Sequence, residues 1–145
     1  MKILVCDDDF TFGIIISRIL KSLGNYVEFA HDGREAQEKI RDKPDFFDVL
    51  ITDNLMPRLS GVELIEKLRM LNVPLKVIMM TGFPNELNAV LQASLRLNGL
   101  LCKPFKSDAL LDCLASLGCD HERQQFNGAC RQTARMPGKL FPLKA

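Results

Sequence analysis

Hydrophobic residues in this chain form two kinds of run, short continuous ones and longer ones with helical spacing. Five short runs, in which most residues are apolar or β-branched, predict buried parallel strands at residues 2–6, 26–30, 49–52, 76–80 and 100–102. The segments that follow them predict helices at residues 10–23, 33–40, 62–71, 86–97 and 107–117. Strands that alternate with helices indicate an α/β fold, a parallel sheet covered on both faces and connected by right-handed crossovers.

Polar residues mark the expected starts of several helices. Asp9 precedes the first helix and is interpreted as its cap, and Asn85 is the expected cap of the fourth. Either Ser107 or Asp108 is the expected cap of the last one.

Charged or hydroxyl-bearing residues stand where four of the strands end. Asp7 and Asp8 follow the first strand, Asp53 the third, Thr81 the fourth and Lys103 the fifth. In an open α/β sheet the carboxyl ends of the strands form the ligand-binding crevice. Taken alone, Asp53 is a common turn residue. If the strands are neighbours, however, the acids can hold Mg²⁺ through oxygen, while the ammonium and the hydroxyl reach phosphoryl oxygens.

Composition narrows the class of protein. The chain has 145 residues, 47% of them apolar and 26% charged, which is typical of one globular domain. It has no signal-peptide core and no apolar stretch of about 18 residues, so we expect a cytoplasmic protein without membrane association. Its five cysteines contain no CxxC pair, and a zinc site is not indicated.

Charge separates a body from a tail. Residues 120–145 hold five Lys or Arg against two acids, whereas residues 1–119 hold fourteen against sixteen. The tail has few apolar residues and no sustained periodicity, so we predict a domain at 1–119 and a basic, flexible segment at 120–145. No DNA-binding helix pair is recognisable after Gly118, and we do not expect nucleic acid as a partner.

Four motifs together resemble the receiver domain of two-component response regulators. They are ILVCDDD, VLITDNLMPRLSG, VIMMTG and LLCKPF, in that order, and the match extends from about residue 2 to residue 117. The chain is similar to the stand-alone chemotaxis and sporulation regulators. The resemblance implies a flavodoxin-like doubly wound sheet of five strands in the order 2-1-3-4-5, with five helices.

The resemblance also implies a role for each site residue. Asp53 would accept a phosphoryl group from a sensor histidine kinase or a histidine phosphotransfer protein. Mg²⁺ would be held by Asp8, Asp53 and the carbonyl of Leu55, with Asp7 acting through water. Thr81 matches the switch hydroxyl and Lys103 the family's ammonium, preceding a cis peptide to Pro104. The signal would pass to a downstream protein, or to a homodimer, through the fourth helix, the fifth strand and the fifth helix.

The chain departs from the family at three places. Leu100 stands where the family usually has an aromatic switch residue. Arg96 and Leu97 replace small residues that end the fourth helix, and we expect this helix to close differently, near residues 98–99. Leu55 and Phe83 are apolar where some members carry polar side chains that orient water, so we expect slow self-dephosphorylation.

Two alternatives remain beside the phosphoacceptor interpretation. One is a receiver-like interaction module that takes no phosphoryl group. The other is a Mg²⁺-dependent phosphohydrolase with an aspartyl-phosphate intermediate, which would need an acid at the position of Leu55. In the phosphoacceptor interpretation the chain transfers a phosphoryl group onto itself, and we do not expect an enzyme with a separate substrate.

Overall fold

The computed structural model describes residues 1–118, in which strands and helices alternate. The strands are β1 (Lys2–Cys6), β2 (Tyr26–Ala30), β3 (Val49–Asp53), β4 (Lys76–Thr81) and β5 (Gly99–Cys102). The helices are α1 (Phe10–Ser22), α2 (Gly33–Asp42), α3 (Gly61–Met70), α4 (Ala89–Leu95) and α5 (Ser107–Leu117), with a 3-10 turn, η1 (Pro84–Glu86), before α4. The predicted tail at 120–145 and the domain boundary before it lie outside the described residues.

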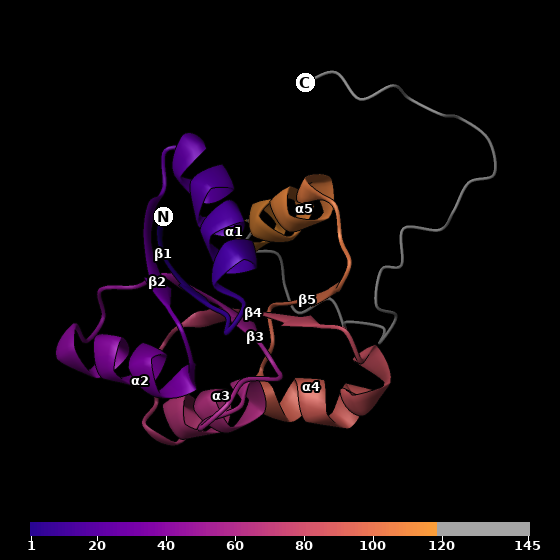
Figure 1. Ribbon diagram of the computed structural model, residues 1–145. Coiled ribbons are helices and arrows are strands. Elements are labelled where there is room, and N and C mark those ends of the chain that lie inside the picture. Colours follow the sequence, from indigo (N-terminus) through magenta and orange to yellow (C-terminus); the bar gives the residue numbers. More distant parts are fainter. Residues whose placement is uncertain (119–145) are drawn as a thin grey trace.

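The five strands form one parallel sheet in the order β2-β1-β3-β4-β5. Helices α1 and α5 cover one face, and α2, α3 and α4 cover the other (Figure 1). The predicted fold class, strand order and number of helices are therefore confirmed. This order places the ends of β1, β3, β4 and β5 next to one another at a single edge of the sheet.

Both faces of the sheet are buried. Along β1, Ile3 and Val5 belong to the core under α1 and α5, while Leu4 and Cys6 belong to the core under the other three helices. All residues of β3 are buried as well. The strands read as continuous apolar runs because a strand with two covered faces has no solvent side.

The start of α4 differs from the prediction. Residues Pro84–Glu86 form the 3-10 turn, Leu87 turns inward to 2% exposure, and α4 begins only after Asn88. The side chain of Asn88, not that of Asn85, accepts a hydrogen bond from the amide of Leu91, 2.9 Å away. Burial of Leu87 thus shifts the helix start by three residues.

The end of α4 also differs. The helix closes at Leu95, and Arg96 takes the left-handed conformation with φ of 53°. Closure near residues 98–99 is prevented because Asn98 already bonds to β4: its amide donates to the Val77 carbonyl, and its side chain accepts from the Val77 amide.

Two other local predictions are confirmed. Asp9 caps α1 by accepting from the Phe12 amide at 3.0 Å, and the peptide between Lys103 and Pro104 is cis. Helix α5 begins at Ser107, and its N-cap residue is Lys106, which makes no side-chain capping bond. The expected cap at Ser107 or Asp108 is therefore wrong, because both residues already lie inside the helix. Within residues 1–118, no helix has the length and apolar character needed to cross a membrane.

Candidate functional site

The fold brings the predicted site residues to one edge of the sheet. Asp7 follows the last residue of β1, and Asp53 and Thr81 are the last residues of β3 and β4. Lys103 follows β5. Because these strands are parallel and β3 and β4 lie between β1 and β5, their ends converge there.

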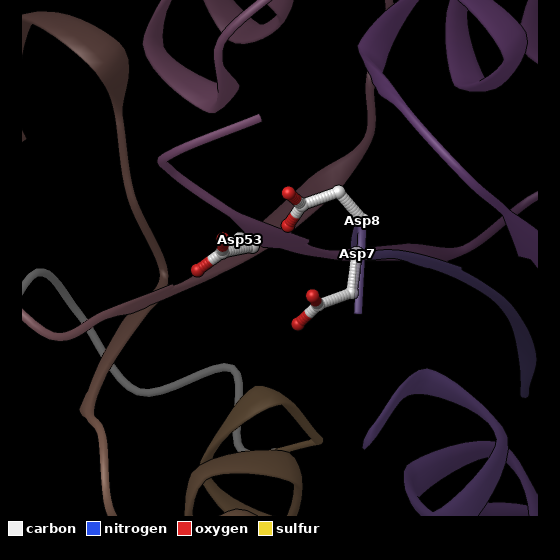
Figure 2. A group of neighbouring side chains, drawn as sticks. All are labelled: Asp7, Asp8 and Asp53. Carbon is white, nitrogen blue, oxygen red and sulfur yellow. The ribbon is translucent and has the colours of Figure 1, made fainter. Parts of the chain in front are cut away.

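Three carboxylates gather at the ends of β1 and β3 (Figure 2). Asp7, Asp8 and Asp53 each offer a carboxylate oxygen, and these three oxygens lie within 4.8 Å of one another. Asp7 is fully buried and Asp53 is 7% exposed, whereas Asp8 faces solvent. The group is therefore open on one side, where a ligand can enter.

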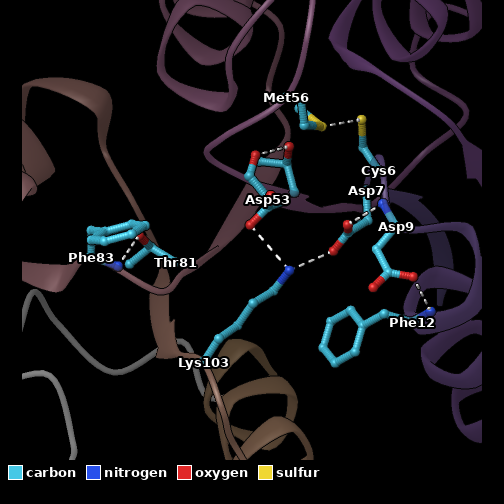
Figure 3. A network of polar contacts seen from close by, with 10 residues as sticks. Cys6, Asp7, Asp9, Phe12, Asp53, Met56, Thr81, Phe83 and Lys103 are labelled. Atoms are coloured by element: carbon cyan, nitrogen blue, oxygen red, sulfur yellow. Dashed lines mark hydrogen bonds and ion pairs between the residues drawn. The ribbon is translucent and has the colours of Figure 1, made fainter.

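The ammonium of Lys103 joins two of these carboxylates. Its Nζ donates to Oδ2 of Asp7 at 2.7 Å and lies 3.2 Å from Oδ1 of Asp53 (Figure 3). The second oxygen of Asp7 accepts from the Asp9 amide at 2.9 Å, which fixes the plane of that carboxylate. Both oxygens of the most buried acid are thus engaged.

An aromatic ring also supports Lys103. Its Nζ lies 4.4 Å from the centroid of the Phe12 ring, a distance that allows a cation–π interaction. Phe12 stands in the first turn of α1, and its ring meets that of Phe105 edge-on. The sequence analysis missed Phe12, because helical spacing alone makes it an ordinary apolar residue of α1.

The charges of the site perturb one another. Burial raises the pKa of the Asp53 carboxyl; the ammonium of Lys103 opposes this rise, but the nearby negative charges keep the pKa raised. Burial also disfavours the charged form of Lys103, yet its hydrogen bond to Asp7 and the two negative charges outweigh burial and raise the pKa of Lys103. Lys103 is therefore a cation at neutral pH, held between two acids.

Thr81 lies at the end of the neighbouring strand and is 1% exposed. Its Oγ1 accepts a hydrogen bond from the amide of Phe83 at 3.0 Å, as Figure 3 shows. The hydroxyl is thus bonded to its own loop in this structure. Phe83 itself is 54% exposed.

The loop after Asp53 carries Leu55, which is 52% exposed. The loop is tied at both ends, because the Asn54 amide donates to the Met80 carbonyl and the Gly61 amide donates to the Asn54 carbonyl. Met56 is held through its sulfur, which lies 3.4 Å from the Cys6 sulfur. Backbone groups of this loop therefore have a defined position beside the carboxylates.

Comparison with known proteins identifies relatives of most of this chain. The family model of the response regulator receiver domain matches residues 3–115. Response regulator MprA of Mycobacterium avium is 37% identical over 112 residues, which are 77% of this chain and 48% of that protein. The chain spans about half the length of the curated relatives it matches.

Solved structures similar to this chain are covered over nearly their whole length. Chemotaxis protein CheY4 of Vibrio cholerae has a TM-score of 0.70 at 32% identity, with 79% of this chain and 95% of that chain covered. Response regulator TrrA of Thermotoga maritima, solved in complex with Mg²⁺-BeF, has a TM-score of 0.70 at 26% identity, covering 80% of this chain and 97% of that one. The chain therefore belongs to the family of response regulator receiver domains, the signalling modules of two-component systems.

Proposed function

We propose that this chain accepts a phosphoryl group on Asp53 and passes the resulting conformational change to a partner protein. The donor is the phosphohistidine of a sensor histidine kinase or of a histidine phosphotransfer protein. Receiver domains as a family are phosphorylated and bind Mg²⁺ at an acidic pocket. The assignment of these roles to particular residues rests on the site geometry described above.

The observation that carries the proposal is the position of Lys103 between Asp7 and Asp53. An oxygen of Asp53 attacks the phosphorus as the bond from phosphorus to the imidazole nitrogen breaks, and the imidazole, which already carries a proton on its other ring nitrogen, leaves as a neutral base. Negative charge on the phosphoryl oxygens needs a cation at a fixed position, and Lys103 supplies one. The chain itself receives the phosphoryl group, and no separate substrate is needed for its role as a signalling module.

The oxygen donors fit a divalent hard cation. Asp8 and Asp53 present carboxylate oxygens within reach of a shared ion, Asp7 lies beside them, and the Leu55 carbonyl is the proposed backbone ligand. Bound Mg²⁺ neutralises charge on the phosphoryl oxygens. Asp7 keeps its hydrogen bonds to Lys103 and the Asp9 amide, which suits a role through water instead of direct coordination.

Thr81 is the proposed switch residue. Its hydroxyl, whose oxygen accepts from the Phe83 amide, donates its hydrogen to a phosphoryl oxygen, which draws the loop after β4 toward Asp53. The loop leads into α4, so the proposed output surface is formed by α4, β5 and α5, for a downstream protein or a second copy of this chain. Leu100 packs against the core beside this surface, in place of the family's aromatic switch residue.

Two apolar side chains flank the proposed phosphoryl site. Leu55 and Phe83 are each about half exposed and offer no polar group to orient an attacking water. We therefore expect slow loss of the phosphoryl group. The position of Leu55 also argues against a phosphohydrolase, since such an enzyme needs an acid there for its leaving group.

Intact-protein mass spectrometry tests the proposal. The protein is incubated with acetyl phosphate, with and without Mg²⁺, and compared with Asp53→Asn and with the control Asp9→Asn, which keeps a helix-capping side chain. We expect one phosphoryl adduct on the wild type and on Asp9→Asn, dependent on Mg²⁺, and none on Asp53→Asn. No adduct on the wild type, under conditions that label another receiver domain, would favour the phosphorylation-independent module.

The rate of phosphoryl loss is measured on the same samples after acetyl phosphate is removed. Slow loss predicts that the adduct persists for many minutes, and Leu55→Asn should shorten its lifetime by giving water a polar partner. A wild-type half-life of seconds contradicts this part of the proposal.

A further inference from the structure

The loop between Asp53 and α3 is attached to α2 by an ion pair outside the carboxylate group. The guanidinium of Arg58, in this loop, bonds to Oδ2 of Asp32, at the N-terminus of α2. The Asp32 side chain is 3% exposed, whereas that of Arg58 is 65% exposed. Oδ1 of Asp32 accepts from the Glu35 amide at 2.9 Å and caps the helix.

The backbone at Arg58 is strained. Arg58 has φ of 68°, and the amide of Leu59 donates to the carbonyl of Pro57 at 2.8 Å across it, which makes Arg58 the centre of a γ-turn. A γ-turn with positive φ is rare and costly for a residue with a side chain, and glycine or asparagine fits it better. An arginine at this position indicates that its side chain contributes an interaction.

A second contact joins the same two elements. A Cβ added at Gly33, the first residue of α2, would lie 2.5 Å from the Leu59 carbonyl oxygen, so the loop backbone lies directly on the start of α2. Leu59 is itself buried. The part of the loop around Arg58 and Leu59 is therefore held by α2. The part nearer Asp53 is held by the bonds of Asn54 and Met56.

We infer that Arg58 and Asp32 position the Leu55 carbonyl for Mg²⁺, and that Arg58 is a positioning residue of the site. Leu55 is three residues before Arg58, in the part of the loop between the Asn54 and Arg58 attachments. Without the ion pair, the loop loses its attachment to the buried carboxylate, and the carbonyl samples positions outside coordination distance. The inference rests on the proposed function, since it assigns a role toward the same metal.

The sign of the effect separates positioning from simple electrostatics. Removal of the positive charge of Arg58 would tighten Mg²⁺ binding if Arg58 acted only through its charge. Loss of positioning weakens binding whichever partner is removed. If the pair positions the carbonyl, both single variants bind Mg²⁺ more weakly. If the two residues act only through their charges, loss of Arg58 tightens Mg²⁺ binding and loss of Asp32 weakens it.

The test is a Mg²⁺ titration of the full chain by isothermal titration calorimetry, on wild type, Arg58→Asn, Asp32→Asn and the double variant. Asparagine suits the positive φ at residue 58 and keeps a cap at residue 32, so both singles retain the local backbone requirements. The control is Arg41→Asn, which removes the same charge from a solvent-exposed pair with Asp42 on the same helix. Thermal unfolding without Mg²⁺ verifies that each variant is folded.

We expect each single variant to bind Mg²⁺ about tenfold more weakly, as when a group that orients a metal ligand is removed, and the double variant to bind no more weakly than either single. Arg41→Asn should match the wild type. Unchanged affinity, tighter binding by Arg58→Asn, or multiplied effects in the double variant would overturn the inference alone. A wild type that binds no Mg²⁺ and takes no phosphoryl group would overturn the proposed function and this inference together.

Discussion

The acidic site, formed by Asp7, Asp8 and Asp53 with the loop that leads into α3, begins where strands of the sheet end. The α4 segment (residues 82–98) also begins at a strand end, but it is packed very differently. Helix α3, which follows the Asp53 loop, buries Gly61, Leu64, Ile65 and Leu68. In the α4 segment only Leu87 and Leu95 are buried, and Val90 is 78% exposed. The difference shows that the groups for chemistry are built into the sheet, whereas the segment next to Thr81 is held by few contacts and has room to move.

Glycine substitutions should give the largest contrast between the two regions. A Cβ at Gly61 would lie 2.3 Å from the carbonyl oxygen of Asp53, a backbone atom that cannot move aside, whereas a Cβ at Gly82 meets nothing within 4 Å. Gly61→Ala should lower the free energy of unfolding by about 3 kcal/mol. Gly82→Ala should change it by less than about 0.5 kcal/mol. Urea unfolding followed by circular dichroism measures both, and equal effects would show that the two regions are equally constrained.

Arg69 is the main polar attachment of α4, and its removal should have the next largest effect. From α3, its guanidinium donates to the carbonyls of Leu95 and Leu75 at 2.9 Å and of Arg96 at 3.1 Å. Arg69→Ala should cost about 2 kcal/mol, because it leaves several carbonyls without this partner. Hydrogen exchange should accelerate in α4 more than in α3.

Arg41→Ala, which removes an exposed ion pair from α2, is the control for that experiment. It should leave exchange and stability close to those of the wild type. Uniform acceleration across the sheet in Arg69→Ala would mean that α4 is not an independent unit.

Ser17 provides a reference away from both regions. It lies on α1 at 4% exposure, and its Oγ has no hydrogen-bond partner within the described residues. Ser17→Ala should stabilise the fold by about 1 kcal/mol, since it removes an unpaired buried hydroxyl and favours the helix. A loss of stability, measured by thermal unfolding, would show that the hydroxyl has a partner.

A smaller stabilisation, specific to the acidic site, is expected of Asp53→Asn without Mg²⁺. Burial raises the folded pKa of Asp53, so the ionised carboxylate destabilises the fold at pH values above that pKa. Asparagine removes this cost, and Lys103 keeps Asp7 as a partner. The variant should have the higher melting temperature at pH 7 in EDTA, and the difference should shrink as the pH falls through the pKa of Asp53. A difference that grows on acidification would contradict the assigned direction.

The sequence was sufficient for the sheet and the acidic site because both depend on strand ends. Asp7, Asp53, Thr81 and Lys103 each stand directly at the end of an apolar run, and parallel strands bring such ends together. The roles of these residues remain proposals, but their proximity was predictable. The loop carbonyl of Leu55 followed only from the family resemblance.

Contacts that side chains make with other elements were not predictable. The Arg58–Asp32 pair and the bond from Arg69 to Leu95 each join residues 26 positions apart, and neither has a local pattern. Asn85 and Asn88 are equally good caps by residue type, and only the burial of Leu87 decides between them. Such choices depend on packing that a single sequence does not display.

The bond between Lys103 and Asp7 joins residues 96 positions apart. During synthesis the chain emerges from its amino end, so both carboxylates leave the ribosome well before their ammonium partner. Closing so long a loop is entropically costly, and the pair forms only after the intervening strands have assembled. A nascent chain that stops short of β5 therefore has its acids but no cation between them, and the proposed phosphoryl acceptance would begin only when the receiver is almost complete.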